Sequence, residues 1–211
     1  MIDAHIWLLF CGTVFGLFGI PGPNMLQALT TSVHEGFRQS LASSLGCLAA
    51  SLLVNTISAA GLGAFMHAEP RWFDVIKYCG GAYLFYLGVS AIYHWRRTSF
   101  TPEPTLQEKR LRGTRLNMRR GFLIGISNPK LILFSVAFFP QFIDRHRDAV
   151  PQFVILFTTF MIGEAMWLVA YAAGGARLSA LLARPRVSYA FNIASGLIFI
   201  AFSVAVIGTR L

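Results

Sequence analysis

Two ionisable side chains lie inside long apolar stretches and are the residues best placed for chemistry. Lys130 is the only charged residue of 121–143, and Glu164 is the only one of 149–176. An ionisable group at membrane depth is unfavourable and therefore indicates a function. An unpaired Glu164 would take up a proton, as a coupling group must, whereas an ion pair with Lys130 would keep both groups charged. The alternatives are that Lys130 reaches back to the membrane surface and that Glu164 is purely structural.

Two motifs rich in glycine and proline interrupt the first and fourth apolar stretches. They are GIPGPN at 19–24 and GISNPK at 125–130, and they share Gly, Ile and Pro at the same three positions. Proline cannot continue a helix, but it suits the first position of one. We therefore expect both stretches to be broken, with Pro23 and Pro129 each beginning a half-helix.

The two breaks together predict an anion site. The first-turn amides of a half-helix have no intrahelical partners and carry about half a unit of positive charge. If the two halves of the chain form an inverted repeat, the two half-helix N-termini approach the membrane centre from opposite sides. We expect such a pair of ends to bind a carboxylate, such as that of an amino acid. The alternative is a pair of proline kinks that pack helices and bind nothing.

The elements that must position these residues are membrane-spanning helices. The chain has 211 residues, of which 55% are hydrophobic and 13% charged, which excludes an ordinary soluble globular protein. A span needs about 20 apolar residues. Six stretches of few charges satisfy this length, at 4–33, 39–68, 72–95, 121–143, 149–176 and 187–209. We expect a single all-α membrane domain of six helices, built as two three-helix repeats, 1–95 and 121–211.

The connector 96–120 predicts the orientation in the membrane. It holds eight basic residues against Glu103 and Glu108, so the positive-inside rule places it in the cytoplasm and both chain ends outside. The net charge of +9 thus reflects topology, and we expect no nucleic-acid partner.

The remaining small and polar residues in the spans favour helix packing. Small residues recur at spacings of three or four, which is typical of close helix contacts. They are Gly12, Gly16 and Gly19 in the first stretch and Ala42, Gly46 and Ala50 in the second. No cluster of His or Cys lies at mid-membrane, so we expect neither a metal nor a cofactor.

Three stretches in the same chain resemble the LysE/RhtB family of bacterial amino-acid exporters. They are Pro21-Gly22-Pro23-Asn24, the run GGAYLFYLG at 80–88, and 125–130 continuing to Phe139-Pro140-Gln141-Phe142. An acidic residue three places before a tryptophan, here Glu164 before Trp167, is also similar to the family. The resemblance implies a bacterial inner-membrane protein, not an enzyme, that exports amino acids in exchange for protons and without ATP.

The resemblance and the two breaks together yield the candidate site. The candidate substrate-binding residues are Pro21, Gly22, Pro23, Asn24, Gln27, Asn128, Pro129 and Lys130, and Glu164 is the candidate for proton coupling. The expected partners are an amino-acid substrate, protons and membrane lipid, and a homodimer is compatible with the small size of the bundle. Export of another small solute or a metal ion on the same fold, and a non-transporting membrane partner protein, are the alternatives.

Overall fold

The computed structural model of the chain describes residues 2–68, 113–137, 139–144, 147–182 and 184–208, with single residues and short pieces between 78 and 93. Within these residues the chain forms helices and no strand. Most of the predicted third span, 72–95, and most of the connector lie outside the described residues. The elements are α1 (Ala4–Gly19), α2 (Pro23–Glu35), α3 (Phe37–Ala68), α5 (Thr114–Ile126), α6 (Pro129–Ala137), the short 3-10 helix η1 (Phe139–Phe142), α7 (Ala149–Leu182) and α8 (Pro185–Gly208).

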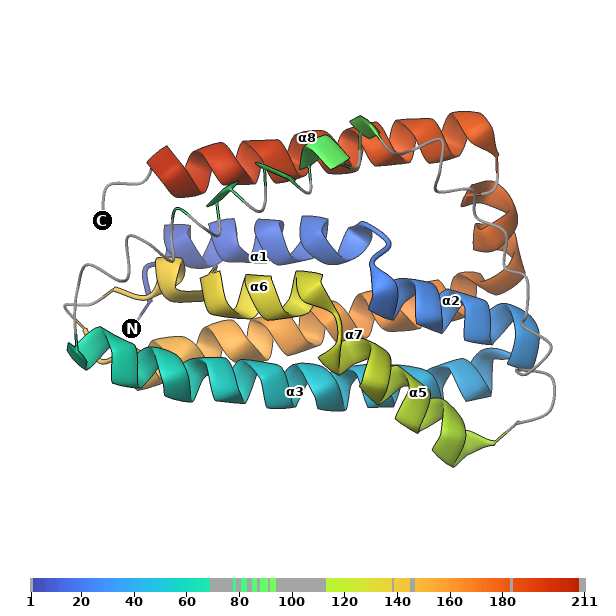
Figure 1. The fold of residues 1–211 in the computed structure, drawn as a ribbon, viewed down its shortest axis with the longest axis horizontal. Helices are drawn as coiled ribbons and strands as arrows, with labels where there is room; N and C mark the ends of the chain where they lie inside the picture. The colour runs from blue at the N-terminus through green and yellow to red at the C-terminus, as the bar shows by residue number, and fades with distance from the viewer. Residues whose placement is uncertain are drawn as a thin grey trace.

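The long elements run back and forth along one bundle axis (Figure 1). The pair α1 and α2 runs in one direction and the pair α5 and α6 in the other, and the beginning of α1 and the end of α8 lie at the same end of the bundle. Opposite directions are what an inverted repeat requires of the two broken segments. The repeat itself, with its six spans, stays a prediction.

The length and composition of the helices fit a membrane protein. Among the described residues, two helices are long and apolar enough to cross a bilayer, namely α3 over Phe37–Ala59 and α7 over Ala149–Leu182. The pair α1 and α2 counts as a third span if its two helices, bent by 47° at the break, are taken together. The expected interruption at 19–24 is therefore present.

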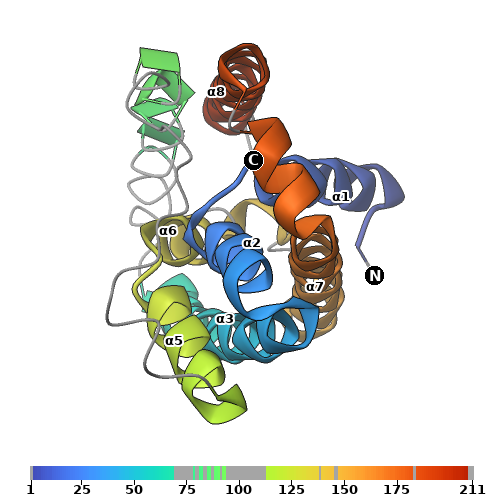
Figure 2. The same ribbon diagram turned by 90° about the vertical axis from the view of Figure 1, so that its right-hand side faces the viewer.

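The half-helix α2 occupies the inside of the bundle. It packs against α7, α3 and α5, and the view along the bundle shows α7 to its right, α3 below it and α5 below and to its left (Figure 2). Helix α8 lies on the outer side, where it contacts α1 and α7. Among the described residues the break itself, 19–22, is half-buried and Pro23 is exposed, whereas Asn24 and Met25, which follow it, are buried in the bundle. Irregular backbone is tolerated within a bilayer where protein covers it.

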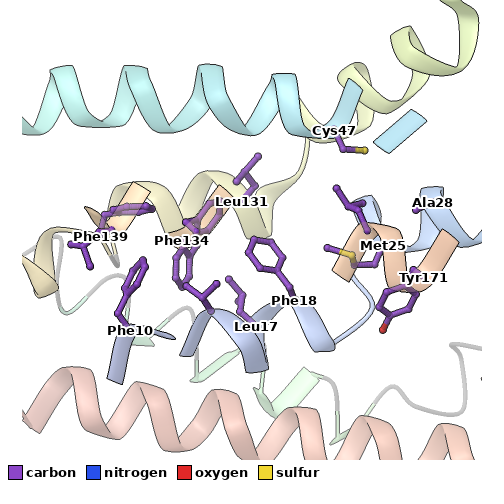
Figure 3. Packing of buried hydrophobic residues seen from close by; sticks show 14 of the residues in the cluster. Phe10, Leu17, Phe18, Met25, Ala28, Cys47, Leu131, Phe134, Phe139 and Tyr171 are labelled. Carbon is purple, nitrogen blue, oxygen red and sulfur yellow. The ribbon is translucent and has the colours of Figure 1, made fainter. Parts of the chain in front are cut away.

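Aromatic rings fill the half of the bundle that contains α1 and α6 (Figure 3). Ring centroids are 5.5 Å apart for Phe10 and Phe139, 5.4 Å for Phe134 and Phe160, and 5.5 Å for Phe139 and Phe160. These four residues, here called the aromatic cluster, are at most 4% exposed. Because the rings come from α1, α6, η1 and α7, they close this half of the bundle to water.

Glycine allows α3 and α5 to pack backbone against backbone. A Cβ atom added to Gly46 would overlap the main-chain oxygen of Met118, and one added to Gly121 would overlap that of Ser43. The predicted small-residue face of the second stretch is thus in close contact. In the first stretch the expectation is not met at Gly12, which has no atom of the described residues within 4 Å of its Cβ position.

Helix α5 begins earlier than the predicted boundary of the connector. It starts at Thr114, with Gly113 at the N-cap, so 114–120 is helical and not loop. The segment contains no glycine or proline before Gly121, and nothing in it opposes a helix once α3 offers a surface to pack on. Three basic residues assigned to a loop, Arg115, Arg119 and Arg120, therefore stand on a helix.

The glycine contact between α3 and α5 leads to a stability prediction. Replacement Gly46→Ala forces the two backbones apart and should destabilise the fold by about 1–3 kcal/mol, the usual effect of overpacking. Gly12→Ala is the matched control, since it adds the same methyl group to a helix where the described residues leave space. Thermal unfolding in detergent, followed by size-exclusion chromatography, measures both variants. Equal melting temperatures for the two variants would contradict the packing.

Candidate functional site

The first break leaves carbonyl groups without helical partners. In an α-helix each N–H donates to the carbonyl four residues earlier. Pro21 and Pro23 have no N–H, so the carbonyl oxygens of Leu17 and Gly19 lose their donors. In an apolar interior such oxygens must be paired by other groups.

Two side chains from the second half of the chain bind these oxygens. The Lys130 Nζ donates to the oxygen of Leu17 and to that of Ile20, the latter at 3.1 Å. The hydroxyl of Tyr171 donates to the oxygen of Gly19 at 2.7 Å. Lys130 therefore points to the carbonyl end of α1, where a positive charge is stabilised by the helix dipole, rather than to the membrane surface.

The second break is capped by its own asparagine. Helix α5 ends at Ile126 and α6 begins at Pro129, as the sequence predicts. The Asn128 Oδ1 accepts from the amides of Lys130 at 3.0 Å and of Leu131 at 3.4 Å. The first-turn amides of α6 are thus occupied in this conformation. The corresponding cap of α2 is Gly22, whose lack of a side chain leaves the first turn of α2 without a side-chain cap.

Three polar side chains connect the two breaks to α7 and are here called the polar chain. The Asn128 Nδ2 donates to the Asn24 Oδ1 at 2.9 Å, and the Asn24 Nδ2 donates to the Glu164 Oε1 at 2.8 Å. Because the Asn128 Oδ1 accepts from a main-chain N–H, the orientation of its amide is determined, and that of Asn24 follows. The polar chain therefore runs in one direction and ends on a carboxyl oxygen that can only accept.

Glu164 keeps one oxygen unused. Its side chain is fully buried, and the Ser51 hydroxyl neighbours it. Neither Glu164 Oε2 nor Ser51 Oγ, however, has a hydrogen-bond partner with good geometry among the described residues. A proton on Glu164 would reside on Oε2, because Oε1 accepts from Asn24. The arrangement can thus accept a proton without any change in the rest of the polar chain.

A small cavity separates the two breaks. Its volume is about 10 Å³, which is about the space that one water requires. At this cavity the described residues therefore leave no room for an amino acid. The cavity is lined by Leu17, Phe18, Gly22, Asn24, Met25, Asn128, Lys130, Leu131 and Phe160.

Four of the nine predicted site residues line this cavity, and a fifth is connected to it. Gly22, Asn24, Asn128 and Lys130 line it, and Glu164 reaches it through Asn24. The prolines of the two motifs, Pro21, Pro23 and Pro129, act through the backbone by ending or starting helices.

One predicted residue is turned away from the others, and two partners were missed. The Gln27 Nε2 donates to Thr31 Oγ1 of its own helix at 3.1 Å, and Gln27 does not line the cavity. Tyr171 and Ser51 were not predicted. Tyr171 follows Glu164 by two helical turns, so it lies on the same face of α7, and a polar group on that face was the signal available in the sequence.

A second polar group, here called the end cluster, joins α2, α3 and α5 at the far end of α2. Arg120 and Glu35 form an ion pair at 3.4 Å. The Asn117 Nδ2 donates to Glu35 Oε2 at 2.8 Å and to Gln39 Oε1 at 3.1 Å. Asn117 is completely buried. The end cluster therefore closes the half of the bundle opposite the aromatic cluster.

A bend in α7 adds a further contact to α2. Gly175 has a φ of 39°, which interrupts the helix and which glycine adopts more readily than other residues. The Ser32 hydroxyl of α2 donates to the oxygen of Ala172, one turn before the bend. Helix α2 is thus attached to α7 both at the polar chain and at the bend.

Comparison with known proteins identifies the family to which the chain belongs. The LysE type translocator family model matches residues 13–209. The chain is 33% identical over 204 residues to an uncharacterized membrane protein of Pseudomonas aeruginosa, covering 95% of this chain and 94% of that protein. It is 29% identical over 204 residues to the homoserine/homoserine lactone efflux protein of Salmonella typhimurium, covering 97% of each chain.

A third relative has a different named substrate, and no solved structure matches the chain. The leucine efflux protein of Salmonella choleraesuis is 27% identical over 203 residues, covering 94% of this chain and 92% of that protein. The family model spans both breaks and nearly the whole sequence. The chain therefore belongs to the LysE type translocator family.

Proposed function

We propose that the protein is a secondary active exporter of amino acids, driven by protons that move inward. The observation that carries the proposal is the polar chain, which connects both helix breaks to a buried carboxyl group with one unused oxygen. Relatives named as efflux proteins for homoserine and leucine support an amino acid as the substrate. As in the sequence analysis, we place the protein in the bacterial cytoplasmic membrane with both chain ends outside.

The substrate carboxylate binds between the two breaks. Lys130 supplies the positive charge, and the first turn of α2, which no side chain caps, supplies main-chain amides. Because the cavity holds about one water, binding requires α2 and α6 to separate. The carboxylate then draws the Lys130 ammonium from the oxygens of Leu17 and Ile20 that it contacts here. Asn128 has to release the amides of α6 if they are to contribute as well.

Glu164 carries the coupling proton. In the closed conformation its Oε1 is held by Asn24, whereas Oε2 can bear the proton. Opening of the breaks separates Asn24 from Asn128 and exposes the carboxyl group to water, in which it ionises. Proton release and substrate binding are therefore coupled through a single asparagine.

The two closed halves of the bundle support alternating access. The aromatic cluster closes the half formed by α1 and α6, and the end cluster closes the half formed by α2 and α5. By the charge of the connector, the end cluster faces the cytoplasm. An amino acid enters when the end cluster opens and leaves when the aromatic cluster opens.

The first prediction concerns proton coupling. Glu164→Gln keeps an acceptor oxygen for Asn24 but cannot release a proton. In proteoliposomes the variant should exchange labelled amino acid across the membrane, yet lose at least about 90% of the transport driven by a pH gradient.

The amino acid used in this experiment is chosen by a screen. The screen compares the efflux of the twenty standard amino acids, starting with leucine, from cells with and without the protein.

Asp148→Asn is the matched control for this experiment, because it also neutralises a carboxylate, but at an exposed position just before the first residue of α7. Transport by this control should remain at the level of the unmodified protein. Gradient-driven transport by Glu164→Gln at full rate would remove the coupling role. The absence of efflux for every amino acid in the screen would overturn the proposed function as a whole.

The second prediction concerns the carboxylate. Lys130→Met keeps the length of the side chain and removes its charge, so the KM for the amino acid should rise at least about tenfold, the effect of losing one charged hydrogen bond. The same variant should transport the corresponding amino-acid amide, which lacks the carboxylate, no worse than the unmodified protein does. An equal loss for both compounds would show that Lys130 only supports the fold.

A further inference from the structure

We propose that a groove between α3 and α5 binds one anionic phospholipid. The groove has a volume of about 420 Å³ and is lined by residues of α3 and α5, two helices that cross each other (Figures 1 and 2). Its floor on the α3 side consists of Gly46 and Ala49. At Gly46 the two helices touch, whereas the small side chain of Ala49, one turn further along α3, is half-buried beside this contact. The other walls are mostly apolar. The site lies outside the breaks and does not depend on the transport mechanism.

Two arginines supply the positive charge of the groove. Arg115 and Arg119 both line it and are both exposed. They are one turn apart on α5, so their side chains extend from the same face. Neither forms an ion pair within the described part of the chain, in contrast to Arg120, which pairs with Glu35. The first turn of α5 adds to this charge, since it contains no acidic residue and no side-chain cap.

Along α5 the groove is first cationic and then apolar, and a phospholipid has a charged headgroup followed by apolar acyl chains. Arg115 lies at the beginning of the helix, whereas Phe122 and Leu123 line the groove two turns further on. At 1.5 Å per residue, this places the cation and the apolar residues about 10 Å apart. A phosphate diester at the arginines would therefore bring the first part of an acyl chain against Phe122 and Leu123.

The exposed apolar side chains favour a lipid over a free phosphate ion. Met118 is 44% and Leu123 is 58% exposed, and both line the groove. A phosphate ion would leave these side chains uncovered, whereas a lipid covers them and neutralises the arginines at once. Basic pockets between membrane helices on the cytoplasmic side bind anionic headgroups in this manner.

Native mass spectrometry of the full chain from nanodiscs tests the proposal. The nanodiscs contain equal amounts of phosphatidylglycerol and phosphatidylcholine with identical acyl chains, and the readout is the ratio of the two lipids that remain bound. The unmodified protein should retain phosphatidylglycerol preferentially. Each of Arg115→Gln and Arg119→Gln should reduce this preference about fivefold, the effect of one basic residue near an anionic surface.

Two further variants separate the groove from general surface charge. The double variant Arg184→Gln/Arg186→Gln removes two exposed arginines, one between α7 and α8 and one in the first turn of α8, and should keep the preference. Ala49→Leu fills the groove but keeps both arginines, and it should reduce retention of phosphatidylglycerol. The proposal is overturned if the control loses as much preference as the groove variants, or if Ala49→Leu retains the lipid unchanged. A two-chain species that Ala49→Leu abolishes would show that a second copy occupies the groove, which also overturns it.

Discussion

The structure depends on the pairing of backbone groups that proline leaves without partners inside an apolar environment. Pro21 and Pro23 remove two donors from the end of α1, and a bilayer offers no water to replace them. The carbonyl oxygens of Leu17 and Gly19 are instead paired by Lys130 and Tyr171, respectively, which come from the second half of the chain. The break in one half of the chain is thus completed by side chains from the other, which explains how a segment that breaks a helix can also hold the bundle together.

The two motifs share Gly, Ile and Pro at the same three positions but differ in their polar side chains. Gly22 and Asn128 hold corresponding positions, as do Asn24 and Lys130. Asn128 caps α6 with its own side chain, whereas Gly22 leaves α2 without a side-chain cap. One break therefore satisfies its amides internally, and the other needs an external acceptor. This asymmetry makes α2 the half-helix that is suited to bind an anion in the proposed mechanism.

Much of this arrangement could be predicted from particular residues, and some of it could not. The breaks follow from proline, which acts locally. The small residues around position 46 predicted a close helix contact, but they did not indicate that α5 is the partner. The partner of Lys130 could not be predicted, because a lysine at this depth could pair with Glu164, contact carbonyl groups or reach the surface with similar free energies. The role of Tyr171 could not be predicted for the same reason, since a single hydroxyl in an apolar helix has many acceptors within reach. The start of α5 was placed too late because the charge of 114–120 suggested a loop, although charge does not oppose an exposed helix.

The glycine contact between α3 and α5 limits which parts of the bundle can move. Main chains that touch directly have no side chains between them to change rotamer, so they cannot slide without steric overlap. Helix α3 belongs to the first half of the chain and α5 to the second. A rocking of the two halves against each other would therefore disrupt the contact between these two helices. The pair is better regarded as a fixed frame that crosses the boundary between the halves. Motion is then left to α2 and α6, which are anchored by polar side chains that can exchange one partner for another.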